Sequence, residues 1–169
     1  WFRLAAVQDH ARALAFLGYM YVEGEGVPQD NKESLKWYLR AANQGHVTAQ
    51  LNIGIAFLNG GGVPKDYKVA MSWFRLAAEE DEETAQYYMG EMYRGGLGVP
   101  KDFKEALKWL KLAAEEKDPG AQTALGAMFE LGQGVDKSLK EAMKWYQLGA
   151  DQGNSLAQNN LGNSYFNGK

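Results

Sequence analysis

The sequence of 169 residues contains no cysteine and only two histidines. The absence of cysteine excludes disulfides, thiolate zinc sites and a cysteine nucleophile, and it is compatible with any redox compartment. No apolar run approaches the roughly 18 residues that a membrane-spanning helix needs. A basic surplus is also missing, because the net charge is −3, so the chain is not pre-charged to bind a polyanion. The remaining composition, 46% hydrophobic and 23% charged, is ordinary for a folded soluble protein.

The first residues, Trp1-Phe2-Arg3-Leu4, do not have the shape of a signal peptide and do not begin with methionine. We therefore expect the chain to start inside a longer protein. Since targeting information can be missing from such a sequence, the localisation is left unassigned.

A period of 36 residues runs through the whole chain. All five tryptophans follow it, as do two sets of glycines, one set of alanines and the valines of four loops. Each such set is called a column here and is named by its first member. The columns are Trp1, Trp37, Trp73, Trp109 and Trp145; Gly18, Gly54, Gly90, Gly126 and Gly162; Gly24, Gly60, Gly96, Gly132 and Gly168; Ala13, Ala49, Ala85, Ala121 and Ala157; and Val27, Val63, Val99 and Val135. Five columns in one register identify a tandem array.

Each repeat has the pattern of two helices, as residues 82–117 illustrate. The segment EETAQYYMGEMYRGG (helix A) spaces its apolar residues at helical intervals and ends in two glycines, which favour a left-handed turn past a helix. After the loop, Asp102 is a suitable N-cap, and Glu105 completes a capping box before the segment FKEALKWLKLAAEE (helix B). The prediction is an all-α fold, a right-handed α/α solenoid (superhelix) of 36-residue helix-turn-helix repeats.

Two features of the repeat predict how its helices are held. The capping box recurs, whereas Asp66 is followed by Val69 and keeps only half of it; the recurrences are Asp30 with Glu33 and Ser138 with Glu141. The alanine column at 13, the alanines at 41–42 with their equivalents, and the glycine column at 18 predict close approach between helices. At the glycines, packing is expected to compensate the poor helix propensity.

The pattern A-x-x-x-(L/I/M)-G-x-x-(Y/F)-x-x-G-x-G-V-P-x-D-x-x-x-A-x-x-W-(Y/F/L)-x-x-A-A resembles the Sel-like repeat (SLR) family, α/α solenoids related to tetratricopeptide repeats. The fourth repeat departs from it, because Asp136 replaces proline and Ser138 replaces aspartate, so a looser turn with an intact cap is expected there. The resemblance implies a protein–protein interaction scaffold without catalytic residues. Family members occur in bacterial envelope and host-interaction proteins and in eukaryotic signalling and quality-control adaptors.

The resemblance covers the whole chain and implies one array over residues 1–169. Its parts are the end of a helix B (1–9), four repeats (10–45, 46–81, 82–117 and 118–153) and a partial repeat with a helix A (154–169).

Candidate chemical sites yield no catalytic, metal or cofactor assignment. The glycine loops lack the preceding strand and the glycine spacing of nucleotide-binding motifs. His10 and His46 share a column at the start of helix A, and without a third ligand they are interpreted as helix-entry residues. Ser34 and Ser138 lie in Ser-x-Lys triplets, but the other motifs of penicillin-recognising enzymes are missing. The acidic run 79–83 lacks the dry pocket that acid–base catalysis needs, and it stays open as a contact for a basic partner.

The predicted function is binding of a peptide or protein segment on the concave face. Helix A lines this face in tetratricopeptide-like arrays, and its variable columns here combine an apolar middle with polar flanks, which suits a few apolar anchors with polar contacts around them. The predicted partner-binding residues are Tyr19, Glu23, Leu51, Ile55, Leu58, Asn59, Tyr87, Glu91, Arg94, Thr123, Glu130, Asn159 and Asn163. The alternative for each is packing between adjacent helices A.

Two other functions stay open. A helical-repeat RNA reader would need a basic groove, whereas this face offers mainly Arg12 and Arg94. An enzyme acting on cell-wall or β-lactam substrates would need a motif that is missing. We expect a protein or peptide partner, no nucleic acid, no membrane span and no cofactor. End-to-end self-association is a further expectation, since the ends around Trp1 and around Leu161 and Tyr165 lack a polar cap.

Overall fold

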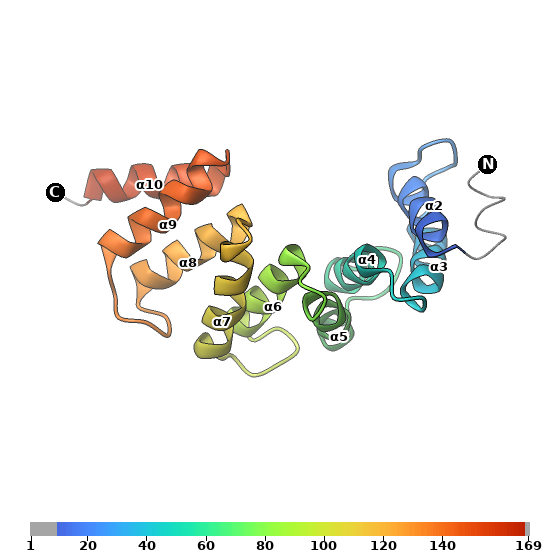
Figure 1. Cartoon of the computed structure of the whole chain (residues 1–169), viewed down its shortest axis with the longest axis horizontal. Coiled ribbons are helices and arrows are strands. Elements are labelled where there is room, and N and C mark those ends of the chain that lie inside the picture. Colours follow the sequence, from blue (N-terminus) through green and yellow to red (C-terminus); the bar gives the residue numbers. More distant parts are fainter. Residues whose placement is uncertain (1–9, 168–169) are drawn as a thin grey trace. The chain divides into compact units, whose positions relative to one another are not determined.

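The structure is a computed structural model that describes residues 10–167. Within this range nine α-helices follow one another along the chain, with no strand (Figure 1). Their bounds are α2 (Ala11–Glu23), α3 (Asn31–Ala42), α4 (Val47–Asn59), α5 (Tyr67–Ala78), α6 (Glu83–Gly95), α7 (Phe103–Glu115), α8 (Pro119–Leu131), α9 (Leu139–Asp151) and α10 (Ser155–Asn167). The even-numbered helices are helices A and the odd-numbered ones are helices B. The prediction that residues 1–9 end a helix B lies outside the described residues.

The chain forms two compact units, Trp1–Asp81 and Glu82–Lys169. In the first unit, α2 packs on α3, α3 on α4 and α4 on α5. In the second, each helix from α6 to α9 packs on the one that follows it, and α6 also contacts α8. This sequential packing of helix pairs confirms the all-α solenoid. Each unit has its own core, in which alanines of both helices are fully buried beside larger side chains such as Ile53 and Leu125.

A glycine ends each helix A that is followed by a loop. Gly24, Gly60, Gly96 and Gly132 adopt φ angles between 69° and 80°, a left-handed conformation that glycine reaches without steric cost. In each case the backbone N–H of the glycine donates to a carbonyl of the last helical turn. The sequence prediction for the end of helix A is confirmed.

The predicted N-caps start each helix B. The Oδ1 atoms of Asp30, Asp66 and Asp102 each accept two backbone N–H bonds of 2.9–3.1 Å from the first turn. Ser138 accepts one bond, of 3.2 Å, from the N–H of Glu141. These side chains satisfy N–H groups that have no partner inside the helix.

The second half of the predicted capping boxes is wrong. The backbone N–H of the cap residue donates back to a helix A carbonyl in the same repeat, at 2.9–3.0 Å. The acceptors form the aromatic column Tyr21, Phe57, Tyr93 and Phe129. Because this bond ties the cap to helix A, the glutamate three residues later has no N–H to accept, and Glu33 instead pairs with Lys36.

The fourth loop is not looser than the others, contrary to expectation. The N–H of Gln133 donates to the carbonyl of Met128 at 2.9 Å, as Gly61 does to Ala56 at 2.8 Å in the second loop. Ser138 is also tied to helix A at the same 2.9 Å that Asp66 shows. Backbone hydrogen bonds therefore hold this turn without the proline.

The glycine column at 18 confirms the predicted close approach and identifies its partner. A Cβ atom placed on Gly54 would lie 2.5 Å from Cε1 of Phe74, which is fully buried on helix B of the same repeat. Gly18 stands in the same way against the ring of Tyr38. The residue after each tryptophan therefore fills a notch that only glycine leaves open. Gly162 has no such neighbour within 4 Å among the described residues.

Candidate functional site

A cavity of about 680 Å³ lies on the helix A side of the first unit. Three aromatic side chains line it: Phe16 and Tyr19 from α2, and Tyr38 from α3. Its polar lining comes from the start of α2 and the first two turns of α4 with its N-cap, and consists of His10, Arg12, His46, Thr48 and Asn52. Phe16 and Tyr19 are 37% and 43% exposed, so the cavity has an accessible aromatic wall.

A second, smaller cavity in this unit has a volume of about 200 Å³. Val22, Ile55 and Asn59 line it, together with Tyr38 and Asn52, which belong to the larger cavity as well. Tyr38 and Asn52 therefore lie between the two cavities.

The second unit has a cavity of about 120 Å³ lined by its three helices A. Tyr87, Glu91 and Arg94 come from α6, Thr123 from α8, and Asn160 from α10. Arg94 donates two hydrogen bonds to the carboxylate of Glu91, at 2.8 and 2.7 Å. This two-point contact fixes both side chains in one geometry.

Burial and charge set the ionisation of these groups. The hydrogen bond to Glu91 raises the pKa of Arg94, so its charge is permanent. Burial raises the pKa of Tyr87 to about 12, which keeps the phenol protonated near neutral pH. Burial, followed by a hydrogen bond to Glu130, also raises the pKa of Tyr146. Apart from the Glu91–Arg94 pair, the lining of this cavity is therefore neutral.

The large cavity of the first unit and the cavity of the second are built from the same columns. Columns 10, 12, 15, 16 and 19 contribute to both. The predicted partner-binding residues include columns 15 and 19. They omit column 12, which holds Arg12 and Leu156, although Arg12 was expected on this face, and column 16, which holds Phe16 and Asn160. Their spacing would have revealed them, because positions 12, 15, 16 and 19 lie on one face of a helix.

The predicted partner-binding residues differ in their exposure and in whether they line a cavity. Leu51 and Thr123 are buried, at 9% and 4% exposure, and Thr123 donates to the carbonyl of Pro119. Glu130 accepts a hydrogen bond of 2.6 Å from the hydroxyl of Tyr146. The residues that line cavities are Tyr19, Ile55, Asn59, Tyr87, Glu91, Arg94 and Thr123. Leu58 is half-buried, and Glu23, Asn159 and Asn163 are exposed. Whether these thirteen residues contact a partner stays a prediction.

The two histidines meet at one cavity, where each is the N-cap of its helix A. Nδ1 of His46 accepts the N–H of Ala49 at 3.3 Å, so this ring caps α4. No group of three His, Cys, Asp or Glu side chains suited to a metal ion occurs among residues 10–167. Across the same residues, no helix is long and apolar enough to cross a membrane.

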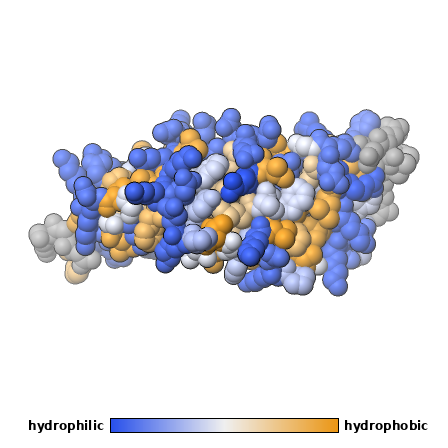
Figure 2. Space-filling model, turned by 90° about the horizontal axis from the view of Figure 1, so that it is seen from below, coloured by the Kyte–Doolittle hydropathy of each residue, from blue (hydrophilic) through white to orange (hydrophobic). Residues whose placement is uncertain are grey.

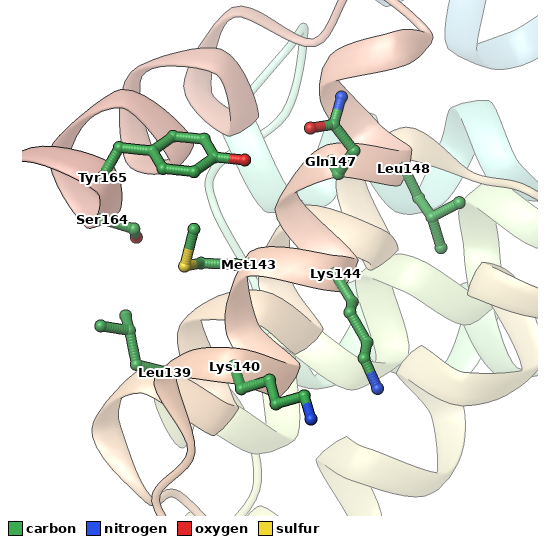
Figure 3. Close-up of a pocket in the computed structure, with 8 residues that line it drawn as sticks. All are labelled: Leu139, Lys140, Met143, Lys144, Gln147, Leu148, Ser164 and Tyr165. Atoms are coloured by element: carbon green, nitrogen blue, oxygen red, sulfur yellow. The ribbon is translucent and has the colours of Figure 1, made fainter. Parts of the chain in front are cut away.

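A further cavity, of about 760 Å³, lies on α9 and α10 (Figure 3). In the view of Figure 3, Met143 of α9 lies between Leu139 of the same helix and Tyr165 of α10, while Lys140 and Lys144 extend away from that ring. Tyr165 is 64% exposed. Elsewhere, on the face shown in Figure 2, hydrophobic residues form patches separated by hydrophilic ones.

These features define a helical-repeat solenoid with hollowed helix A faces. The Sel1 repeat model matches residues 11–46, 47–82, 84–118, 119–154 and 155–169. The chain therefore belongs to the Sel1 repeat family, as its columns implied. The matched segments begin one or two residues after the repeat starts that the sequence suggested.

Structures of similar proteins agree with this family. A Sel1 repeat protein from Oxalobacter formigenes is 40% identical, with a TM-score of 0.87 over 93% of this chain and 64% of that one. A protective antigen of uropathogenic Escherichia coli with an SLR fold is 39% identical, with a TM-score of 0.92 over 99% of this chain and 36% of that one. The chain thus spans about two thirds and one third of their lengths.

A Pseudomonas aeruginosa immunity protein shares the fold at 21% identity, with a TM-score of 0.62 over 92% of this chain and 58% of that one. At this identity the likeness concerns the fold alone. No curated protein matches the chain.

Proposed function

We propose that this chain is a protein-interaction scaffold that binds a peptide or protein segment on the helix A face of its units. The observation that carries the proposal is the recurrence of a cavity at the same columns in both units. The side chains in those columns differ between repeats, whereas the caps, loops and glycine notches stay nearly constant. A constant frame with a variable lining is suited to recognition.

The lining also has the composition of a binding site. Exposed aromatic rings such as Tyr19 bury a large area at low cost in side-chain entropy. The polar groups around them give direction and specificity. Because backbone hydrogen bonds tie each loop to helix A, the face is formed before a partner arrives.

A panning experiment tests the proposal. Random linear peptides displayed on phage are selected on the chain, and the affinity of the selected peptides is measured by fluorescence anisotropy. The triple variant Tyr19→Ala, Ile55→Ala, Tyr87→Ala removes apolar anchors from both units. We expect at least a roughly tenfold loss of affinity, because hot-spot side chains each contribute more than about 1 kcal/mol.

The matched control is Tyr67→Ala, Leu76→Ala, Leu112→Ala. These side chains are 37%, 46% and 40% exposed on helices B, so a similar apolar area is lost on the other side of the repeats. The control is expected to bind like the unmodified chain, and circular dichroism checks that both variants stay helical. Undiminished binding by the helix A variant would contradict the proposal.

We also propose that the chain has no catalytic activity of its own and does not read RNA. Ser34 is 2% exposed, and the hydroxyl of Ser138 is engaged as the N-cap of α9, which supports the first part. The net charge of −3 supports the second. Turnover of a chromogenic β-lactam that is lost in the Ser138→Ala variant would refute the first part. A band shift with single-stranded RNA at low salt would refute the second.

A second copy of the chain is the proposed occupant of the exposed face of α10. Gly162 has an open notch there, and Tyr165 and Phe166 are 64% and 78% exposed. In the complete repeats the notch is filled by the residue after tryptophan. Residues 1–6 carry the corresponding sequence, Trp1-Phe2-Arg3-Leu4-Ala5-Ala6, which makes Phe2 the matching residue.

Sedimentation velocity over a range of protein concentrations tests this association. We expect concentration-dependent oligomers that disappear in both the Phe2→Ala and the Gly162→Gln variants, with Leu112→Ala as the unaffected control. A monomer at every concentration would refute it.

A further inference from the structure

The large cavity of the first unit has a one-sided electrostatic character. His10, Arg12 and His46 line it, and none of its lining residues is an aspartate or glutamate. Within the described residues Arg12 takes part in no ion pair. A guanidinium in this state keeps its donors available for an anion.

The neutral polar groups of the cavity also favour a ligand that accepts hydrogen bonds, because they present N–H donors. Nδ1 of His46 accepts the N–H of Ala49, so the ring proton sits on Nε2, which is then a donor. One N–H of Asn52 is used by the carbonyl of Thr48 at 2.8 Å, which leaves the second N–H of that amide. The cavity therefore offers a guanidinium, an imidazole N–H and an amide N–H.

Aromatic groups provide the other half of the site. The rings of Phe16 and Tyr19 are 6.2 Å apart and tilted by 34°, and both are accessible. Tyr38 is nearly buried beside them, and burial raises its pKa to about 12, so no phenolate repels an anion near neutral pH. At about 680 Å³, the cavity lies in the range of pockets that hold a ligand the size of several side chains.

The equivalent cavity of the second unit lacks this character. Its arginine, Arg94, is already neutralised by two hydrogen bonds to Glu91, and its volume is only about 120 Å³. The anion-accepting feature thus belongs to the first unit, although both cavities use the same columns.

We propose that this cavity binds an acidic protein segment in which a carboxylate stands next to an aromatic or large aliphatic side chain. The carboxylate is held by Arg12 and His46, and the apolar side chain packs on Phe16 and Tyr19. This assignment rests on the proposed function and specifies the partner that its first unit selects.

The repeats themselves supply substitutions that preserve the fold. In column 12 threonine occurs twice, so Arg12→Thr removes the charge at a tolerant position. In column 10, Asp118 and Asn154 cap their helices by accepting an N–H, as His46 does. His46→Asp therefore keeps the cap while adding a negative charge, and His46→Asn keeps it without one. Lys68→Thr on α5 is the control that matches the charge change of Arg12→Thr.

The peptide panning described above is repeated on the unmodified chain and on the variants. Peptides that compete with one another for the first unit should be enriched in Asp or Glu beside Phe, Tyr, Leu or Ile. Binding of such a peptide should weaken about tenfold with Arg12→Thr, as expected for the loss of a charged hydrogen bond. It should weaken more with His46→Asp than with His46→Asn, and not at all with Lys68→Thr.

The outcomes distinguish the proposed function, peptide binding on the helix A face, from the assignment of an acidic segment to the first unit. If the unmodified chain selects no peptide at all, the proposed function fails, and this assignment fails with it. If peptides are selected and lost in the Tyr19, Ile55, Tyr87 variant but show no acidic preference, the assignment alone is refuted. Equal binding by the Arg12→Thr variant and the Lys68→Thr control would refute it as well.

Discussion

At the scale of single residues, one column after helix B combines glycine with residues that pay a conformational penalty. Gly45 and Gly153 adopt φ angles of 78° and 83°, and the same column holds Asp81 at 59° and Lys117 at 68°. A residue with a Cβ atom is strained in this region, and a lysine side chain cannot make the local hydrogen bond by which the short side chains of aspartate and asparagine relieve the strain.

We therefore expect Lys117→Gly to raise the free energy of unfolding by about 0.5–1 kcal/mol, the strain relieved less the added entropy of an unfolded glycine. The reverse change, Gly153→Lys, should lower it by a similar amount. Chemical denaturation measures both, and a destabilised Lys117→Gly variant would show that the strain is absent.

A second residue-scale feature is an unsatisfied amide in the first unit. In the second unit, Oε1 of Gln122 accepts a hydrogen bond of 2.8 Å from Nε2 of Gln152. Gln50 occupies the same column as Gln122, two repeats earlier. Its buried Oε1 has no hydrogen-bond partner within the described range. In the first unit, the position that corresponds to Gln152 is occupied by Glu80. A carboxylate only accepts hydrogen bonds, so Glu80 cannot donate one to Gln50.

Glu80→Gln should supply the missing donor and raise the free energy of unfolding by about 1 kcal/mol. Its neighbour Glu79 provides the control, since Glu79→Gln makes the same change in charge without reaching the amide. Equal effects of the two variants in thermal or chemical denaturation would refute the explanation.

At the scale of helices and loops, the cap residue of each helix B makes two contacts. Its side chain caps helix B, and its backbone N–H donates a hydrogen bond to a carbonyl of helix A. Asp102 caps α7 through its carboxylate, and its own N–H donates to the carbonyl of Tyr93 at 3.0 Å. Glu105 is therefore not needed at the start of the helix, and its contact with Lys108 is a long 3.9 Å.

Asp102→Ala should lower the free energy of unfolding by about 1–2 kcal/mol, because two N–H groups lose their acceptor. Glu105→Ala should change it by less than about 0.5 kcal/mol, as for a surface ion pair. A loss with Glu105→Ala as large as that with Asp102→Ala would restore the full capping box.

The glycine notches make a second prediction at this scale. Gly54→Ala would force its methyl group into the buried ring of Phe74, which should cost about 1–3 kcal/mol. Gly162→Ala meets nothing within 4 Å and should stabilise α10 by up to about 1 kcal/mol through helix propensity. The two variants are compared by thermal unfolding at a protein concentration at which the chain is monomeric, so that no second copy fills the notch of Gly162. Effects of the same sign would contradict the predicted packing of Phe74 against Gly54.

Most of this local structure could be predicted from the 36-residue period of the sequence. Columns of tryptophan, glycine and alanine predicted the helix pairs, and Asp102 and its equivalents predicted the caps, because these features depend on residues close in sequence. The bond from the cap N–H to Tyr93 was missed, since it joins two helices across a loop. Columns 12 and 16 were left out of the predicted partner-binding residues because these were taken from a family register rather than from helical geometry.

At the scale of the whole chain, the constant and the variable parts of the repeat have different tasks. Caps, loops and notches form the frame, and the columns that line the cavities differ between the two units. The first unit offers Arg12 and two histidines, whereas the second contains an internal ion pair. A chain built in this way can present two different surfaces from one repeat.

Amide hydrogen exchange with and without a selected peptide tests the central claim most directly. Binding on the helix A face predicts added protection in helices A, in α2 and α4 for a peptide bound to the first unit and in α6, α8 and α10 for one bound to the second. Helices B should be unchanged. Protection confined to α3, α5, α7 or α9 would contradict the account.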